Sequence, residues 1–245
     1  SGVVTSTLVH TDKGLVPIEQ LKVGDMVLSK HESGEGEQAY KRVVRMFKSE
    51  EKKKIIYVSY LIANHDDSVK TGYLFCTKDH HFWVKSSNEE QKMSWLPAIN
   101  LTTWKNHELE TYNDKYAVMF NIENSDENKF LRASPNGEIA YLHYHCHKLD
   151  PEGVIDFRGN CPIIISGKGL NISTIDVTES LDAIKHTDKD LADNELIELN
   201  ELLHKAINQG IDFEAHVYNI EVEDFHTYFI GKAGILTHTS ANITP

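Results

Sequence analysis

Short runs of alternating apolar and polar residues fill both ends of the chain. Near the N-terminus, β-branched and apolar residues alternate from Val4 to Thr11, and a turn signal follows at residues 12–14. Residues 217–222 alternate in the same way near the C-terminus. Side chains of a strand point to opposite faces in turn, and short strands broken every eight to twelve residues are typical of β-rich folds. The pattern predicts that both ends belong to one mainly β structure.

The middle of the chain has a different pattern. Residues 193–208 carry apolar side chains at helical spacing, and Gly210 follows as a stop signal. We therefore expect residues 102–212 to form an inserted or side region of mixed α and β structure. This region would separate a first part, residues 1–101, from a last part, residues 213–245. The residues of the predicted apolar helix face are Leu196, Leu199, Leu203 and Ile207.

Charge and composition narrow the classes of function. The 245 residues carry a formal net charge of −12, which is the wrong sign for a protein that neutralises phosphates, so we expect no nucleic-acid partner. No apolar run is long enough to predict a membrane span, and no signal peptide is recognised. Three cysteines do not make a disulfide framework and slightly favour a reducing compartment such as the cytoplasm. They are Cys76, Cys146 and Cys161.

A first candidate for chemistry is the pair Thr77 and His80, three residues apart in a short polar segment. An imidazole can protonate a leaving amide nitrogen, and a hydroxyl can stabilise a developing oxyanion. Such a pair can address one peptide bond. The alternative is a solvated histidine in a loop.

Three further candidates lie close to the C-terminus. Asp224 and His226 are two apart in a stretch that we expect to be extended, so both side chains would share one face of a strand. An acid and an imidazole on one face can share a proton. His238 precedes the hydroxyl residues Thr239 and Ser240, where it could assist cleavage of the local peptide bond. The alternatives are a polar strand face and a solvated histidine near a chain end.

The expected insertion contains a cluster of potential metal ligands. His143, His145 and His147 alternate around Cys146, and imidazole with thiolate suits zinc. The spacing is not that of a standard zinc finger. The alternative is a polar strand or loop that contains one buried cysteine.

The order and spacing of these motifs resemble the Hint family, which includes inteins, bacterial intein-like domains and the autoprocessing domain of Hedgehog proteins. The resemblance extends over the first and last parts of the chain. The resembling stretches are residues 7–14, 17–19, 23–27, 77–84, 95–101, 217–229 and 234–238.

The resemblance implies a mainly β, horseshoe-like Hint fold with an inserted α+β region. It also implies roles for the first candidates. Thr77 and His80 would activate the peptide bond at the N-terminal side of the domain. Asp224 and His226 would assist the acyl shift and the cleavage at the C-terminal side.

At the C-terminal end the resemblance implies that His238 supports cyclisation of the next residue and that Ser240 is the downstream nucleophile. Two positions depart from the family. Counting back from the first motif places the nucleophile at Gly2, which has no side chain, with Ser1 one step out of register. Thr239 replaces the terminal Asn and lacks the amide that forms a succinimide. We therefore expect that the chain as written does not complete splicing.

The expected function is that of an intein-like domain that splices or cleaves its own flanking peptide bonds in a single turnover. Its partners would be the flanking segments of its own precursor, and no cofactor would be required. One alternative is a degenerate Hint scaffold that binds zinc or another protein. Another is a Hedgehog-like transfer of an ester-linked group to an outside nucleophile.

Overall fold

The computed structural model of the chain describes residues 1–63, 69–86, 92–102, 105–113, 116–119, 130–137, 139–143, 151–156, 163–166, 185–188 and 193–239. These residues are mainly in strands, as the alternating pattern predicts. The largest sheet contains 14 strands. They are β1 (Val3–Val4), β2 (Leu8–Thr11), β3 (Gly14–Pro17), β4 (Met26–Ser29), β5 (Ala39–Lys48), β7 (Ile56–Ala63), β8 (Val69–Cys76), β9 (His81–Ser86), β10 (Met93–Pro97), β11 (His107–Glu110), β12 (Tyr116–Met119), β20 (Val217–Val222), β21 (Thr227–Ile230) and β22 (Ile235–His238).

The pairing of this sheet returns to its starting point. The order is β10-β9-β11-β12-β7-β8-β1-β20-β5-β4-β2-β21-β22, with β3 on β2, and β22 also pairs with β9. Two short 3₁₀ helices, η1 (Ile18–Gln20) and η2 (Ala98–Asn100), follow β3 and β10. Because of this closure β22, the last strand of the order, also has a hydrogen-bonding neighbour on both sides. The largest apolar cluster of the described residues lies inside, with side chains such as Val9, Phe82, Ile220 and Tyr228 fully buried.

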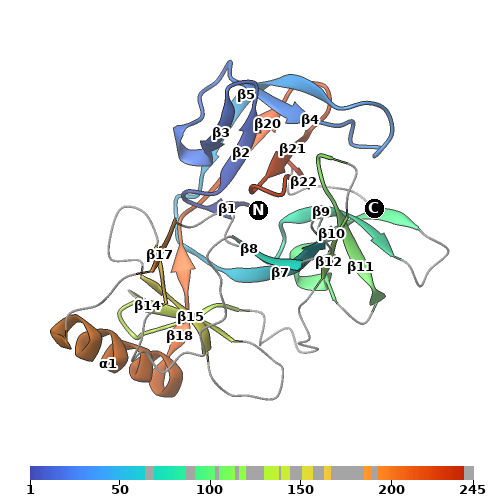
Figure 1. The fold of residues 1–245 in the computed structure, drawn as a ribbon. Helices are drawn as coiled ribbons and strands as arrows, with labels where there is room; N and C mark the ends of the chain where they lie inside the picture. The colour runs from blue at the N-terminus through green and yellow to red at the C-terminus, as the bar shows by residue number, and fades with distance from the viewer. Residues whose placement is uncertain are drawn as a thin grey trace.

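Both ends of the described chain lie in the interior of this sheet. β1 lies between β8 and β20, and Val3 is paired with Cys76 on one side and Tyr218 on the other. β22 lies between β21 and β9, and Thr237 of β22 is paired with Phe82 of β9. In Figure 1 the N-terminus accordingly lies in the middle of the strands rather than at their edge. The closed sheet therefore holds the first residues near the last strand.

A smaller sheet and one helix lie beside the large sheet (Figure 1). The sheet order is β17 (Lys185–Asp188), β16 (Ile163–Ser166), β15 (Pro151–Asp156), β14 (Ile139–His143), β13 (Arg132–Ala133) and β18 (Ile211–Asp212). A two-stranded sheet joins β6 (Lys53–Lys54) to β19 (Glu214–Ala215). β11 and β12 belong to the large sheet, although both fall in the stretch expected to be an insertion.

The predicted helix is confirmed as α1 (Asp193–Gln209), which ends at the residue before Gly210. It contacts β13 and β14. In the part of the chain that the structure describes, no helix has the length and apolar character needed to cross a membrane.

Candidate functional site

The first residues of the chain lie beside the Thr77–His80 segment that follows β8. The pairing of β1 with β8 makes the residues before β1 run alongside those after β8. The Thr77 amide donates to the Gly2 carbonyl (2.9 Å), and the Gly2 amide donates to the Thr77 hydroxyl (3.1 Å). The Ser1 hydroxyl lies 3.2 Å from His80 Nδ1. A hydroxyl nucleophile and an imidazole are therefore in hydrogen-bond contact.

The expectation that the nucleophile falls at Gly2 is wrong in this structure. A Cβ at Gly2 would lie 2.7 Å from the backbone oxygen of Tyr218 and 3.0 Å from the side chain of Val217. Real Cβ atoms do not approach backbone oxygens this closely, so the second position has no room for a reactive side chain. The hydroxyl that reaches the imidazole is that of Ser1.

His80 is fully buried and is held from both ring nitrogens. On the side opposite Ser1, its Nε2 lies 2.6 Å from the Thr237 hydroxyl. Burial, together with the charge of the nearby N-terminal amine, lowers the pKa of His80 to about 3, although Asp79 opposes the shift. The imidazole is consequently neutral at pH 7, as an acceptor of a hydroxyl proton must be.

Asp79 binds the N-terminal amine. Its carboxylate lies 3.0 Å from the Ser1 nitrogen. Burial acts to raise the pKa of Asp79, but hydrogen bonds from Thr77 and from the amine, with the charge of the amine, outweigh burial and lower the pKa overall. A carboxylate that stays ionised is thus fixed beside the nitrogen that would leave in an acyl shift.

The expectation of an extended segment around Asp224 and His226 is also wrong. Both residues lie in the tight turn that joins β20 to β21, and their φ angles are 63° and 55°. They therefore do not share a strand face. Asp224 is exposed, and its carboxylate lies 3.0 Å from Lys41 Nζ. The His226 carbonyl accepts from the Thr239 amide at 2.9 Å, so the turn supports the last described residue.

His238, the last residue of β22, is buried against the loop after β4. Its Nε2 lies 3.1 Å from a Glu32 carboxylate oxygen, and its ring meets the Trp95 ring edge-on at a centroid distance of 5.0 Å. Burial lowers the pKa of His238, and Glu32 opposes this shift. The Trp95 indole also donates to the Glu32 carbonyl at 2.8 Å, which fixes the loop that carries the carboxylate.

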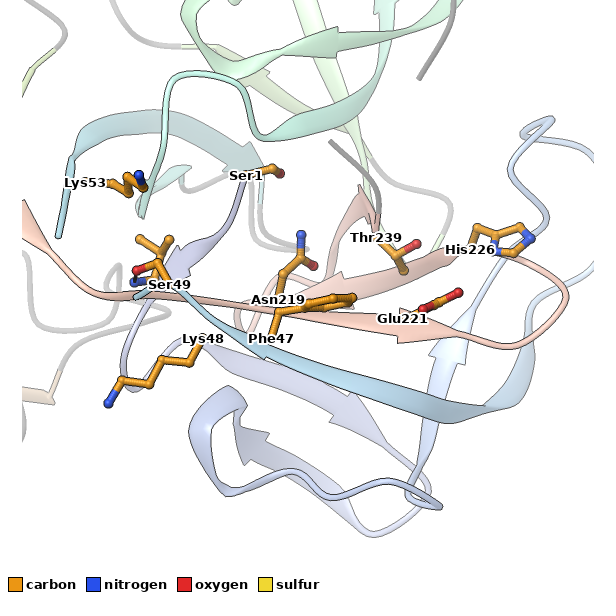
Figure 2. A pocket seen from close by; sticks show the side chains of 10 residues that line it. Ser1, Phe47, Lys48, Ser49, Lys53, Asn219, Glu221, His226 and Thr239 are labelled. Atoms are coloured by element: carbon orange, nitrogen blue, oxygen red, sulfur yellow. Dashed lines mark hydrogen bonds between the residues drawn. The ribbon is translucent and has the colours of Figure 1, made fainter. Parts of the chain in front are cut away.

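One pocket of about 560 Å³ adjoins both ends of the described chain. Ser1, Asn219, His226 and Thr239 are among its lining residues, and Figure 2 shows the Asn219 side chain directed toward Ser1 and Thr239. The Asn219 oxygen accepts from the Tyr228 hydroxyl (2.8 Å) and from the next backbone amide (2.9 Å). Because the oxygen is occupied, the amide NH₂ is the group that faces the pocket.

The zinc prediction falls largely outside the described residues. His143 is the last residue of β14, where the register with β15 shifts. His145, Cys146 and His147 are not described, and neither is the candidate nucleophile Ser240. Within the described ranges, no group of three or more potential ligands could hold a metal ion. Cys76 is buried and free, and Cys146 and Cys161 lie outside these ranges.

Several residues of the site were not predicted from the sequence. Asn219 and Thr237 lie in predicted strands, but alternation does not say which buried polar residue meets the chain end. Asp79 lies inside the predicted motif, and a carboxylate next to His80 was the one sequence feature that could have indicated its role in the site. The contacts of Ser1 and Glu32 depend on pairings across the whole chain. The missed residues are Ser1, Glu32, Asp79, Asn219 and Thr237.

The comparisons with known proteins find similarity in structure only. No family model matches the chain, and no curated protein matches it. The chain is similar to a bacterial intein-like domain from Clostridium thermocellum, with 18% identity, a TM-score of 0.48 and coverage of 97% of this chain and 98% of that one. It is also similar to the gp41-1 intein, with 17% identity, a TM-score of 0.43 and coverage of 97% and 99%.

A DnaB intein from Synechocystis sp. PCC 6803 is 10% identical, with a TM-score of 0.46 and coverage of 98% of this chain and 99% of that one. Similarity to inteins, which the motifs predict, is thus found among solved structures. Identities below 20% and TM-scores below 0.5 assign neither a family nor an activity. Any assignment of function depends on the geometry around Ser1.

Proposed function

We propose that the chain is an intein-like self-processing domain that activates the peptide bond preceding Ser1. The observation that carries this proposal is the contact between the Ser1 hydroxyl and the neutral, buried His80 imidazole, 3.2 Å apart. Asp79 at 3.0 Å from the Ser1 nitrogen supports it, since a leaving amine gains a proton and a positive charge. The reaction is a single turnover within one chain.

The proposed first step converts an amide into an ester. In a precursor with a residue before Ser1, His80 Nδ1 accepts the hydroxyl proton while Ser1 Oγ attacks the preceding carbonyl carbon. The carbon–nitrogen bond then breaks, and the Ser1 nitrogen takes up the proton and pairs with Asp79. The Asn219 NH₂ group in the same pocket is the proposed donor for the oxyanion.

The proposed fate of the ester is transfer to water or to another nucleophile. Water gives a carboxylic acid on the released segment and restores the Ser1 hydroxyl. Ser240 remains a proposed acceptor of the acyl group. Cleavage after Thr239 is not part of the proposal, because a hydroxyl side chain cannot form a succinimide. His238, His226 and the exposed Asp224 are proposed to act on the C-terminal side, in acyl transfer to Ser240 and in cleavage where Asn replaces Thr239.

Partners and cofactors follow from this chemistry. The proposed partner is the polypeptide segment that precedes Ser1 in the precursor. Each group that the acyl shift needs is a side chain of the chain itself, so the proposal includes no required cofactor. The zinc prediction for His143, His145, Cys146 and His147 is separate. Metal analysis of the purified protein checks it, and less than one zinc per chain would remove it.

A fusion protein tests the proposed function. A folded tag is joined before Ser1 through a flexible linker, and the intact mass is followed over time. We expect release of the tag, leaving a chain that begins at Ser1. Ser1→Ala removes the nucleophile and should abolish release, while the control Ser33→Ala removes an exposed hydroxyl of a loop and should not. A fusion that stays intact between pH 6 and 9 would refute the proposal.

A further inference from the structure

We infer that Thr237 is a positioning residue that fixes the tautomer of His80 with its proton on Nε2, so that Nδ1 is the base for Ser1. The tautomer follows from the contacts of Thr237 alone. Its effect on the reaction of Ser1 rests on the proposed function. Thr237 lies on β22 and is fully buried. Its hydroxyl contacts two groups, His80 Nε2 at 2.6 Å and the His81 carbonyl oxygen at 2.8 Å.

The assignment follows from counting protons. A hydroxyl has one hydrogen to donate, and a carbonyl oxygen can only accept. The Thr237 hydroxyl therefore donates to the His81 carbonyl and accepts from His80 Nε2–H. A neutral imidazole has one N–H, so a proton on Nε2 leaves the lone pair on Nδ1. That lone pair faces the Ser1 hydroxyl, so Nδ1 can accept the hydroxyl proton.

The strand arrangement explains how a residue near the C-terminus reaches a base that acts on the N-terminus. β22 pairs with β9 at Thr237↔Phe82, which places the Thr237 side chain beside the residues that precede β9. Successive side chains of a strand point to opposite faces. Thr237 thus contacts His80, whereas the next residue, His238, contacts Glu32. One strand carries groups for both ends of the chain.

The tautomer can be observed directly, without any cleavage reaction. Long-range ¹H–¹⁵N spectra of the histidine-labelled full chain distinguish a protonated Nε2 from a protonated Nδ1. We expect the Nε2–H form for His80 in the unmodified protein. Thr237→Ser keeps the hydroxyl and should keep this form. Thr237→Val keeps the shape but leaves Nε2–H without its partner, so a fraction of the Nδ1–H form should appear.

Cleavage of the tagged fusion supplies the second readout. Thr237→Val should slow tag release roughly 10- to 100-fold, because a buried unpaired N–H disfavours the reactive tautomer. Thr237→Ser should restore most of the rate. The control Thr227→Val also removes a buried hydroxyl from the same hairpin, yet Thr227 contacts Ser29 and Lys30 rather than His80, so the tautomer should not change.

The outcomes separate this inference from the proposed function. A Nδ1–H form of His80 in the unmodified protein would overturn the role of Thr237, even if the tag is released. An unchanged tautomer in folded Thr237→Val would overturn it as well. The Nε2–H form in a protein that never releases its tag would leave the geometry intact and refute the proposed function instead.

Discussion

The backbone oxygen of Tyr218 leaves no room for a side chain at position 2, so only Ser1 of the first two residues can carry a nucleophile. The Tyr218 carbonyl oxygen would lie only 2.7 Å from a Cβ on Gly2, whereas the Ser1 hydroxyl reaches His80. Counting residues back from a motif could not predict that Ser1, and not residue 2, is the reactive position. The count gives a sequence number, but it does not say how the first residues pass between β8 and β20. The motif itself was informative, since the sequence pair Thr77 and His80 is brought to the first residues as expected.

Thr239→Asn tests the missing C-terminal step. An Asn side chain can attack its own carbonyl carbon to form a succinimide, and Thr239 lines a pocket with room for it. We expect release of a tag fused after Ser240 only in this variant, measured by intact mass. Thr239→Ser provides the matched control because it has no amide. Release from the Ser variant at the rate of the Asn variant would contradict a succinimide route.

The buried His80 should make stability depend on pH. Its folded pKa of about 3 lies below the ordinary 6.5, so the unfolded chain binds the proton more readily. The free energy of unfolding should therefore fall as the pH falls from 6.5 toward 3, by about 1.4 kcal/mol per pH unit from this group. Urea denaturation at several pH values measures the slope. His80→Asn should reduce it, and equal slopes in both proteins would contradict the prediction.

The turn between β20 and β21 is the element that alternation predicted least well. Alternation reports which face a side chain occupies, but it does not report the sign of φ. Asp224 and His226 both have left-handed backbone angles, which turn the chain sharply between two correctly predicted strands. The predicted helix, by contrast, was found because its spacing and its terminal Gly210 are local signals.

Glycine at position 226 should relieve backbone strain in this turn. A side chain at φ 55° costs about 1 kcal/mol relative to glycine. We therefore expect His226→Gly to be more stable than His226→Ala by about that amount, measured by chemical denaturation. Both variants lose the imidazole, so the comparison isolates the backbone. An Ala variant as stable as the Gly variant would show that the turn relaxes.

Closure of the large sheet is the property of the whole molecule that brings the two chain ends together. The mainly β class was predictable because short alternating runs are local. The pairing of β22 with β9 joins residues far apart in sequence, and no local pattern encodes it. The membership of β11 and β12 in the large sheet is also a consequence of long-range pairing.

The smaller sheet should be removable without loss of the large one. Ala133 and Ile211 are register partners, so a two-residue Asn-Gly turn can replace residues 134–210. We expect a cooperative thermal transition and tag release within about tenfold of the full chain, because none of the described residues that contact Ser1 or His80 lies in the deleted stretch.

The substitution Leu131→Ala in the shortened chain checks whether its apolar core is still packed. Leu131 is fully buried and packs with Ile55, Tyr57 and Phe213 against the large sheet. Adding Leu131→Ala to the shortened chain should cost about 2–5 kcal/mol, seen as a lower transition temperature. A shortened chain that does not fold, although Leu131 and Phe213 are kept, would show that the smaller sheet supports the larger one.

Trapping with hydroxylamine tests the ester on Ser1 most directly. Hydroxylamine attacks an ester carbonyl and leaves a hydroxamate at the C-terminus of the released segment, which mass spectrometry distinguishes from a carboxylic acid. The fusion with Ser1 should give the hydroxamate, and Ser1→Ala should give no release. Release as the acid at an equal rate from both proteins would contradict an acyl shift onto Ser1, and so would a fusion that hydroxylamine leaves intact.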